Sequence, residues 1–325
     1  MHPTVSWLGS ALLVAAGTSV VIAQAASTGS GQDFPNRPIR LITSLPGGGS
    51  DFASRLIAQS VAGPLGQPVV VENRISSVTG ETAMRAQPDG YTLLVDGNSF
   101  WFAPLMQKTP YDVLRDFTPV TQALAAPNIL VMHPSVTATS VSELIALAKA
   151  RPGQLNYASS GTGSSQHLAM EMLKAMAGIN IVHVPYKGNG PALTGVIAGE
   201  VQLLSSSAAA VAPFMKSGKL KALAVTSGAP SALLPGLPTI ASSGLPGFEL
   251  VSRTGLFASG QPPKPVINRL NQEIVRALNT KEVKEKFLNA GIETVGNTSE
   301  EFTAAIKSEI ARMGKVIKDA GIRAD

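Results

Sequence analysis

The chain has 325 residues, of which 44% are hydrophobic and 14% are charged, a composition typical of a folded globular protein and not of a disordered one. Its 26 Lys and Arg residues outnumber its 21 Asp and Glu residues and give a net charge of +5. The basic residues are scattered and do not form a stripe with aromatic residues, which argues against nucleic-acid binding. The length exceeds that of one typical domain and favours two lobes.

The residue inventory limits the chemistry of the protein. There are no cysteines, so disulfides, thiolate metal sites and cysteine nucleophiles are excluded. The histidines are His2, His133, His167 and His183, and no two of them have the i, i+4 spacing of a helical zinc pair. We therefore expect no metal and no cofactor.

The first residues predict export. Residues 7–23 are apolar or small and uncharged, and Ala23-Gln24-Ala25 is a small-x-small sequence that a signal peptidase accepts. We expect a signal peptide over residues 1–25, cleavage after Ala25 and a periplasmic mature protein. Met1 to Ser6 contain no Lys or Arg, which leaves a misassigned start codon or an uncleaved anchor as alternatives.

Short β-branched runs then alternate with helical stretches, the pattern of a parallel α/β architecture. Residues 39–42 predict a strand, residues 52–62 a helix with one apolar face, and residues 69–71 and 92–95 two further strands. Pro88-Asp89-Gly90 marks a turn between helix and strand.

A second set of elements begins near residues 129–132. Ser140 and Glu143 form a capping-box pattern that opens a helix through Ala150. Further strands, with helices between them, are predicted at residues 155–157, 181–184, 201–204 and 220–225. A proline-rich segment follows at residues 230–246. The chain then ends in three predicted helices, at residues 265–279, 281–289 and 299–319.

One α/β lobe interrupted by another predicts a chain that crosses between lobes twice, with a hinge at the crossings. We place the crossings near Pro127 and Gly247, partly on the resemblance described below. The predicted bounds are 26–126 plus 248–325 for a discontinuous lobe 1, and 127–247 for lobe 2.

Two glycine-rich turns join a strand to a helix, at Ser44–Asp51 and at Ala158–Ser165. A helix N-terminus leaves backbone N–H groups unpaired and carries a partial positive charge, so it favours a carboxylate or phosphate. Each turn alone is either a ligand contact or only a turn. Neither matches a dinucleotide fingerprint or a P-loop.

No catalytic constellation is evident. The segment Ser160–Ser164 is not a nucleophile elbow, and His167 on the following helix is interpreted either as a packed side chain or as a ligand contact. His183 lies within a predicted strand, in the core.

Two other groups follow strands, at the end where α/β sheets hold ligands. The aromatic segment Phe100–Phe102 either stacks on a ligand or packs against the next helix. The serine run Ser205–Ser207 either presents hydroxyls to the cleft or caps a helix.

The candidate ligand-binding residues come from these segments. They are Ser44, Leu45, Pro46, Gly47, Gly48 and Asp51 in the first turn, Asn98, Ser99 and Trp101 after the strand at 92–95, Ser159, Ser160, Gly161, Thr162, Gly163, Ser164 and His167 in and after the second turn, and Ser205 and Ser206 after the strand at 201–204.

Several ordered blocks resemble the Bug-type substrate-binding proteins of tripartite tricarboxylate transporters. In the first part of the chain they are 37–42 (RPIRLI), 65–74 (LGQPVVVENR), 88–94 (PDGYTLL) and 110–112 (PYD); in the second they are 157–161 (YASSG), 183–188 (HVPYKG) and 218–226 (GKLKALAVT). The resemblance extends from about Phe34 to the C-terminus.

The resemblance implies a periplasmic binding fold of type II, with a small organic carboxylate enclosed between two lobes. Backbone amides and waters at two loops would hold the carboxylate, and these loops correspond to Ser44–Asp51 and Ser159–Ser164. It implies a binding protein without enzymatic activity, with the membrane permease subunits of such a transporter as partners. A monomer is the default expectation for a freely diffusing shuttle. A binding protein that presents its ligand to a sensor kinase or regulator is the alternative, and an α/β hydrolase-like enzyme is a third hypothesis.

Departures from the family pattern concern specificity. The first loop is one residue shorter than is usual in the family, residues 75–80 replace a glycine-rich stretch, and Arg253-Thr254 stands where two aromatic residues are usual. Arg253 is either a second anion contact or a surface residue. The sequence does not distinguish a dicarboxylate, tricarboxylate, amino acid, nicotinate-like or aromatic acid as the ligand.

Overall fold

The structure is a computed structural model that describes residues 34–46, 49–75, 78–231 and 233–323. The predicted signal peptide lies outside these residues. Within them, no helix is both long and apolar enough to cross a membrane.

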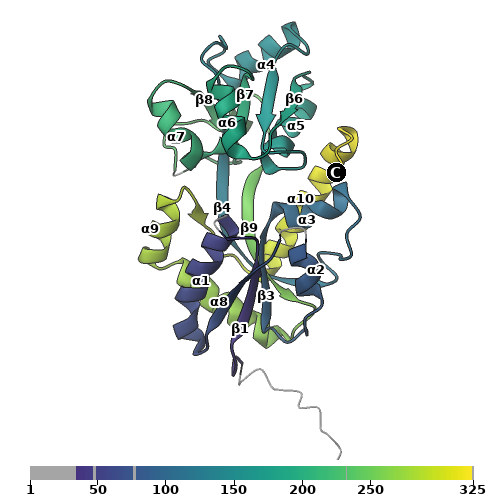
Figure 1. The fold of residues 1–325 in the computed structure, drawn as a ribbon, viewed down its shortest axis with the longest axis vertical. Helices are drawn as coiled ribbons and strands as arrows, with labels where there is room; N and C mark the ends of the chain where they lie inside the picture. Colours follow the sequence, from purple (N-terminus) through teal and green to yellow (C-terminus); the bar gives the residue numbers. More distant parts are fainter. Residues whose placement is uncertain (1–33, 47–48, 76–77, 232, 324–325) are drawn as a thin grey trace, which may run out of the picture.

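The chain forms two α/β lobes joined by two strands (Figure 1). The strand order is β2-β1-β3-β9-β4-β7-β5-β6, with β8 and β10 also paired to β4. The bounds of the strands are β1 Ile39–Thr43, β2 Val69–Asn73, β3 Thr92–Gly97, β4 Phe117–Met132, β5 Asn156–Ser159, β6 Val182–Pro185, β7 Leu203–Ser207, β8 Lys221–Val225, β9 Val251–Ser259 and β10 Glu293–Thr294.

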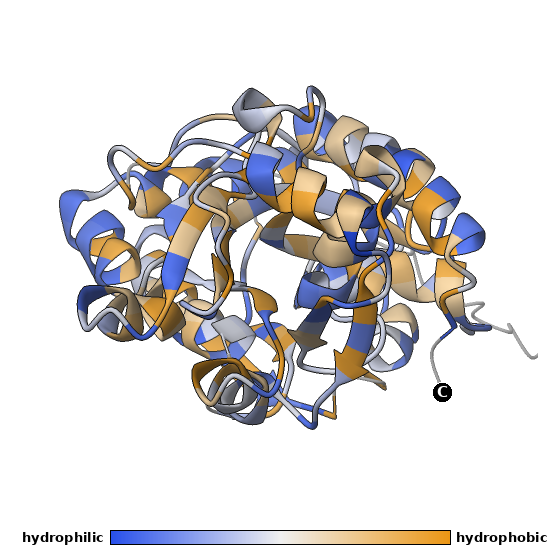
Figure 2. Ribbon diagram, turned by 90° about the horizontal axis from the view of Figure 1, so that it is seen from above, coloured by the Kyte–Doolittle hydropathy of each residue, from blue (hydrophilic) through white to orange (hydrophobic). Residues whose placement is uncertain are grey.

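Helices cover both lobes. The helices of lobe 1 are α1 Gly49–Leu65, α2 Thr79–Met84, α3 Asn98–Met106, α8 Lys264–Leu278, α9 Lys281–Asn289 and α10 Ser299–Asp319. The helices of lobe 2 are α4 Val141–Ala150, α5 Ser165–Ala177, α6 Asn189–Ile197, α7 Ala208–Lys216 and a short 3-10 helix, Ala241–Ser243. Hydrophilic and hydrophobic residues alternate along the peripheral helices (Figure 2), as expected for helices with one face on the sheet.

The first lobe is built around a mixed sheet. Strands β2, β1 and β3 are parallel, and β9 and β4 extend this sheet in antiparallel pairs. Helices α1 and α8 pack on one face, where Ile57, Leu93 and Leu270 belong to one buried cluster. On the other face, α10 packs over β9 and β4 through Phe302 and Ile306.

The second lobe is built on the far half of β4. Its residues Asn128 to Met132 pair with β7, and β7 then pairs with the parallel strands β5 and β6. The change of partner falls between Pro127, which faces Val251 of β9, and Asn128, which faces Ser207 of β7. The predicted lobe bounds, with crossings near Pro127 and Gly247, remain predictions.

The strand β4 is sixteen residues long, and its first part was not predicted. Pro119 and Pro127 interrupt the sequence pattern, because proline cannot donate to a strand ladder. In the structure the register of β4 against β9 shifts beside Pro119 and again between Gln122 and Leu124. The strand β9 was also missed, because Arg253 and Gly255 break its apolar run.

Helices α4 and α10 begin at the capping residues that the sequence contains. Ser140 accepts a hydrogen bond from the amide of Glu143 and caps α4, although the Glu143 carboxylate accepts from Thr139 rather than from Ser140. A full capping box, Thr298 with Glu301, opens α10. One expectation is corrected: Ser205 and Ser206 lie inside β7 rather than after it, so they do not cap α7.

Candidate functional site

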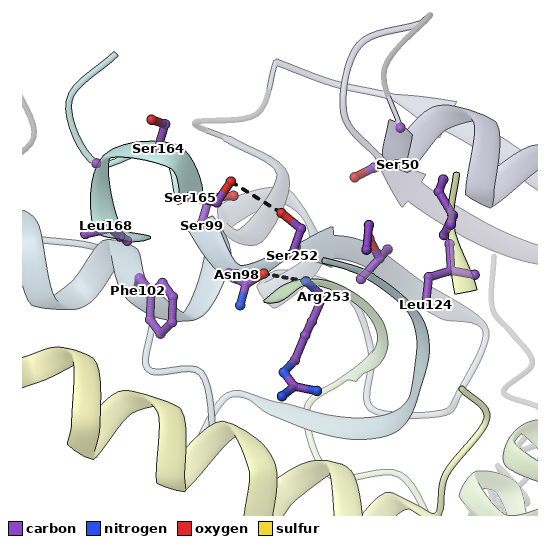
Figure 3. A pocket seen from close by; sticks show the side chains of 16 residues that line it. Ser50, Asn98, Ser99, Phe102, Leu124, Ser164, Ser165, Leu168, Ser252 and Arg253 are labelled. Atoms are coloured by element: carbon purple, nitrogen blue, oxygen red, sulfur yellow. Dashed lines mark hydrogen bonds between the residues drawn. The ribbon is translucent and has the colours of Figure 1, made fainter. Parts of the chain in front are cut away.

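Three helix N-termini meet at one cavity of about 410 Å³ between the lobes (Figure 3). Lobe 1 contributes Gly49 and Ser50 of α1 and the segment Gly97–Ser99 at the start of α3. Lobe 2 contributes the segment Gly163–Ser165 at the start of α5. Each N-terminus presents a partial positive charge, so the three together favour an anion.

The first amides of α3 and α5 are available to a ligand. No side chain caps α3, whose N-cap is Gly97. At α5 the Ser164 hydroxyl accepts from the amide of His167, which leaves the amides of Ser165 and Gln166 without a partner inside the helix. A carboxylate in the cavity is therefore offered backbone donors from both lobes.

The remaining wall comes from the two strands that join the lobes. Leu124 and Ala126 belong to β4, and Ser252, Arg253 and Thr254 belong to β9. The Ser252 hydroxyl lies 3.3 Å from that of Ser165 and donates to it, so α5 is linked directly to β9 (Figure 3). Phe102, Leu168 and Ile292 add apolar surface.

The loop between β5 and α5 is held by hydrogen bonds from behind. The Ser159 hydroxyl accepts from the amide of Gly161 at 3.2 Å and contacts His183 Nε2 at 2.7 Å. The amide of Gly163 donates to His167 Nδ1 at 3.0 Å. Lobe 2 therefore presents a preorganised loop to the cavity.

A second chain of hydrogen bonds supports the same loop. The amide of Ser160 donates to Gln166 Oε1 at 2.7 Å, and Gln166 Nε2 donates to Asn189 Oδ1 at 2.5 Å. The hydroxyl of Ser206 also donates to Asn189 Oδ1, at 2.9 Å. Ser206, a predicted ligand contact, thus acts on the loop through Asn189 and does not line the cavity.

Behind the loop lies a stack of three rings. His167 and His183 are stacked with centroids 4.0 Å apart, and Tyr157 stacks on His183 at 4.9 Å. Burial, with the neighbouring His183, lowers the pKa of His167 to about 4, and burial also lowers the pKa of His183. Both imidazoles are therefore neutral near pH 7, and His167 Nδ1 is free to accept the Gly163 amide.

The polar side chains at the start of α3 belong to a buried network around Glu309 of α10. Glu309 pairs with Arg253 at 2.5 Å and accepts from Trp101 Nε1 at 2.9 Å and from Asn98 Nδ2 at 3.2 Å. Arg253 also pairs with Glu249 at 2.6 Å, and its backbone amide donates to Asn98 Oδ1. Arg253 lines the cavity, but its guanidinium group forms ion pairs with two carboxylates, which makes a second anion contact less favourable.

The structure brings together only part of the predicted set. Asn98, Ser99, Gly163 and Ser164 line this cavity, and a neighbouring cavity of about 540 Å³ is lined by Ser99 and the whole segment Ser160–Ser164. Both polar atoms of the Asn98 side chain are hydrogen-bonded within the protein, so we expect its backbone amide rather than its side chain to face a ligand.

Other predicted residues lie away from both cavities. Trp101 is buried and bonded to Glu309, which agrees with the packing alternative. Asp51 is buried, pairs with Arg55 and accepts from Asn73, so it fixes the start of α1. Ser205 is buried in β7.

The first turn is described only in part. Leu45 is 53% exposed, and Ser44 accepts from the Asn73 side chain through its carbonyl. Neither these residues nor Pro46 line the cavities. Gly47 and Gly48 lie outside the described residues.

Sequence reasoning missed the contribution of the joining strands. Ala126, Ser252 and Thr254 carry no motif, and small or hydroxyl side chains in a strand are ordinary. Only the pairing of β4 with β9 places them opposite the helix N-termini. The departure at Arg253-Thr254 from the family pattern was the one signal that pointed to this wall.

A serine and a histidine do come into contact, but not as a catalytic pair. Ser159, 2.7 Å from His183 Nε2, has no exposed surface, and its hydroxyl also donates to the carbonyl of Gly161. A nucleophile must reach its substrate, so this contact is structural.

Comparison with known proteins places the chain in a family. Residues 53–322 match the model of the tripartite tricarboxylate transporter family receptor. The Bordetella pertussis protein BugT is 36% identical over 320 residues, which cover 96% of this chain and 98% of BugT.

Solved structures of related proteins have the same fold as this chain. An R. palustris protein solved with adipate is 33% identical, has a TM-score of 0.74, and is matched over 90% of this chain and 99% of its own. MatC from Rhodopseudomonas palustris, solved with malate, is 28% identical with a TM-score of 0.70, over 87% of this chain and 100% of its own. The chain therefore belongs to the tripartite tricarboxylate transporter receptor family, a family of solute-binding proteins and not of enzymes.

Proposed function

We propose that this protein captures a small organic carboxylate in the cavity between its lobes. The observation that carries the proposal is the meeting of the α1, α3 and α5 N-termini, from both lobes, at one cavity. Related proteins have been solved with adipate and with malate, which are carboxylates that suit such a site.

Binding would favour the closed arrangement of the lobes. A ligand that accepts hydrogen bonds from Ser99 of lobe 1 and Ser165 of lobe 2 has full contacts only when both are near, so it shifts the equilibrium toward closure. The closed shape is then what a partner recognises.

We further propose an exported, monomeric protein that delivers its ligand to the permease subunits of a tripartite tricarboxylate transporter. The family match supports the partner, and the apolar segment at residues 7–23 with Ala23-Gln24-Ala25 supports export. Co-purification of the ligand-loaded protein with those membrane subunits tests the partnership.

The binding site is tested by the variant Ser165→Asp, with Ser165→Asn as its matched control. Aspartate in the first turn of a helix is favourable, so the variant should fold at least as stably as the native protein. Its carboxylate enters the anion cavity, and a like charge about 4 Å away weakens binding by roughly tenfold or more.

The measurement is a thermal-shift screen against small carboxylates, because a ligand that binds the native state raises its stability. We expect shifts with the native protein and with Ser165→Asn, and none with Ser165→Asp. Equal shifts in all three would place the carboxylate elsewhere, and no shift with any carboxylate in the native, ligand-free protein would overturn the proposed function.

A further inference from the structure

The second cavity adjoins the first and is available to the other end of a ligand. Its volume is about 540 Å³, and it shares Ser99, Gly163 and Ser164 with the first cavity. A ligand whose carboxylate lies at the helix N-termini therefore has room to extend past these residues. The groups in the second cavity then decide which ligand is preferred.

An acidic side chain lines this second cavity. Asp96 is at the end of β3, is only 7% exposed, and contributes to the cavity wall together with Thr79 and Tyr111. One carboxylate oxygen accepts from the Thr79 hydroxyl at 2.8 Å, and the other accepts from the amide of Gly97 at 2.7 Å. Because a carboxylate has about four lone-pair sites, Asp96 can accept further hydrogen bonds.

In the part of the chain that the structure describes, no cationic side chain pairs with this carboxylate. Among the described residues Asp96 forms no ion pair, in contrast to Glu309, which lies against Arg253. Lys108 belongs to the same cavity but is exposed at its rim. A buried, unneutralised carboxylate repels a second carboxylate on the ligand and attracts a donor.

We propose that Asp96 determines specificity by selecting ligands that carry a hydrogen-bond donor, above all an ammonium group, at the end remote from the bound carboxylate. This inference rests on the proposed function, since it assumes that the first cavity holds a carboxylate. The preferred ligand class is then amino acids with separated charges, followed by hydroxy acids, with dicarboxylates last.

The test compares probes that differ only in their remote group. One series is 6-aminohexanoate, 6-hydroxyhexanoate and adipate, and a shorter series is 4-aminobutanoate, 4-hydroxybutanoate and succinate. Dissociation constants are measured by calorimetry for the native protein, for Asp96→Asn and for the control Asp319→Asn, which makes the same charge change at the exposed end of α10.

We expect the native protein and Asp319→Asn to bind the amino probe of at least one series about tenfold or more tightly than the matching diacid. Asp96→Asn should lose this preference or reverse it. A diacid bound as tightly as the amino probe by the native protein, or an unchanged preference in Asp96→Asn, would overturn the role of Asp96. Absence of binding by every probe would instead count against the proposed carboxylate site.

A pH series on the native protein gives a second readout that needs no variant. Burial raises the pKa of Asp96 to about 6, and the amino probes keep their charges between pH 7.5 and 5. Their affinity should therefore fall as the pH drops through 6, and it should not fall in Asp96→Asn. The other groups near Asp96 in this cavity are Tyr111 and the exposed Lys108. Burial and Asp96 raise the pKa of Tyr111 to about 12, and burial lowers the pKa of His167 behind the loop to about 4, so neither of these two groups changes charge between pH 7.5 and 5.

Discussion

His167 contributes to the binding loop without facing the cavity. Its Nδ1 accepts the amide hydrogen of Gly163, and this contact needs an unprotonated nitrogen. The groups around the ring are His183, Tyr157, Glu171 and Lys174, and burial outweighs the carboxylate of Glu171 in setting its pKa. A neutral imidazole is therefore part of the structure of the loop.

The lowered pKa of His167 makes the stability of the folded protein depend on pH between about 4 and 6.5. The pKa of His167 is lowered from 6.5 to about 4 in the folded protein, so between these values the unfolded state binds one more proton. The stabilisation is fully present above pH 6.5 and is lost as the pH falls toward 4, by at most about 3 kcal/mol. In urea unfolding at pH 7, 5.5 and 4.5, His167→Asn should lose less stability with falling pH than the native protein. Parallel pH profiles for the two proteins would contradict this account.

At the scale of elements, α10 depends on a glycine in β9. A Cβ placed on Gly255 would lie 2.2 Å from the ring of Phe302, which is fully buried on α10. Phe302 also lies against Trp101 and Phe257, with centroids 6.0 and 5.2 Å apart. Helix α10, which contains Glu309, can therefore pack closely on β9 because residue 255 has no side chain.

We expect Gly255→Ala to destabilise the protein by about 1–3 kcal/mol, because the ring of Phe302 must move away from a packed core. Phe302→Leu leaves space at the same contact, so the double variant should be more stable than the sum of the two single changes predicts. Urea unfolding of the four proteins measures this coupling. Strict additivity would show that the two positions do not share the contact.

The two lobes are joined by β4 and β9 and also touch on either side of the cleft. A Cβ on Gly163 of lobe 2 would lie 3.0 Å from the sulfur of Met106 in lobe 1. On the other side the Ser231 hydroxyl donates to Glu293 of β10 at 2.7 Å. Helix α5 of lobe 2 also packs against α10 of lobe 1. The joining strands are continuous across the lobes, so we expect closure to be a rotation about β4 and β9 that changes these contacts.

The absence of native cysteines makes this motion measurable. Gln107 follows α3 in lobe 1, and Thr162 precedes α5 in lobe 2. Both residues are exposed and line the second cavity, so spin labels at Gln107→Cys and Thr162→Cys would report the distance between the lobes. Ligand should shorten the distance between the labels and narrow its distribution, because closure brings the cavity walls together. The control pair Gln107→Cys and Arg85→Cys lies within lobe 1 and should not respond. An unchanged distance for the first pair, at a ligand concentration that gives a thermal shift, would rule out closure.

The site could be predicted from the sequence where a local pattern carries it. The turn before α5 was a candidate because it joins a strand to a helix N-terminus and matches a block of the family, and Ser160 to Ser164 do line a cavity. Trp101 and Asp51 were placed in the ligand set by their position in the chain. The Trp101 side chain is instead buried and donates to Glu309, and the Asp51 side chain is buried and accepts from Asn73; neither partner is near in sequence.

The sequence by itself determined the α/β class, the helix boundaries with capping residues, the family resemblance and the positions of the glycine-rich strand-to-helix turns, since these depend on patterns within short segments of the chain. Only the tertiary structure decided that three helix N-termini meet at one cavity, that β4 and β9 form its wall, that Arg253 is neutralised and that Asp96 lines the adjoining space. These features join segments up to about two hundred residues apart, as Asn98 and Glu309 do with a separation of 211. Such contacts depend on strand pairing and packing, which no local sequence pattern specifies.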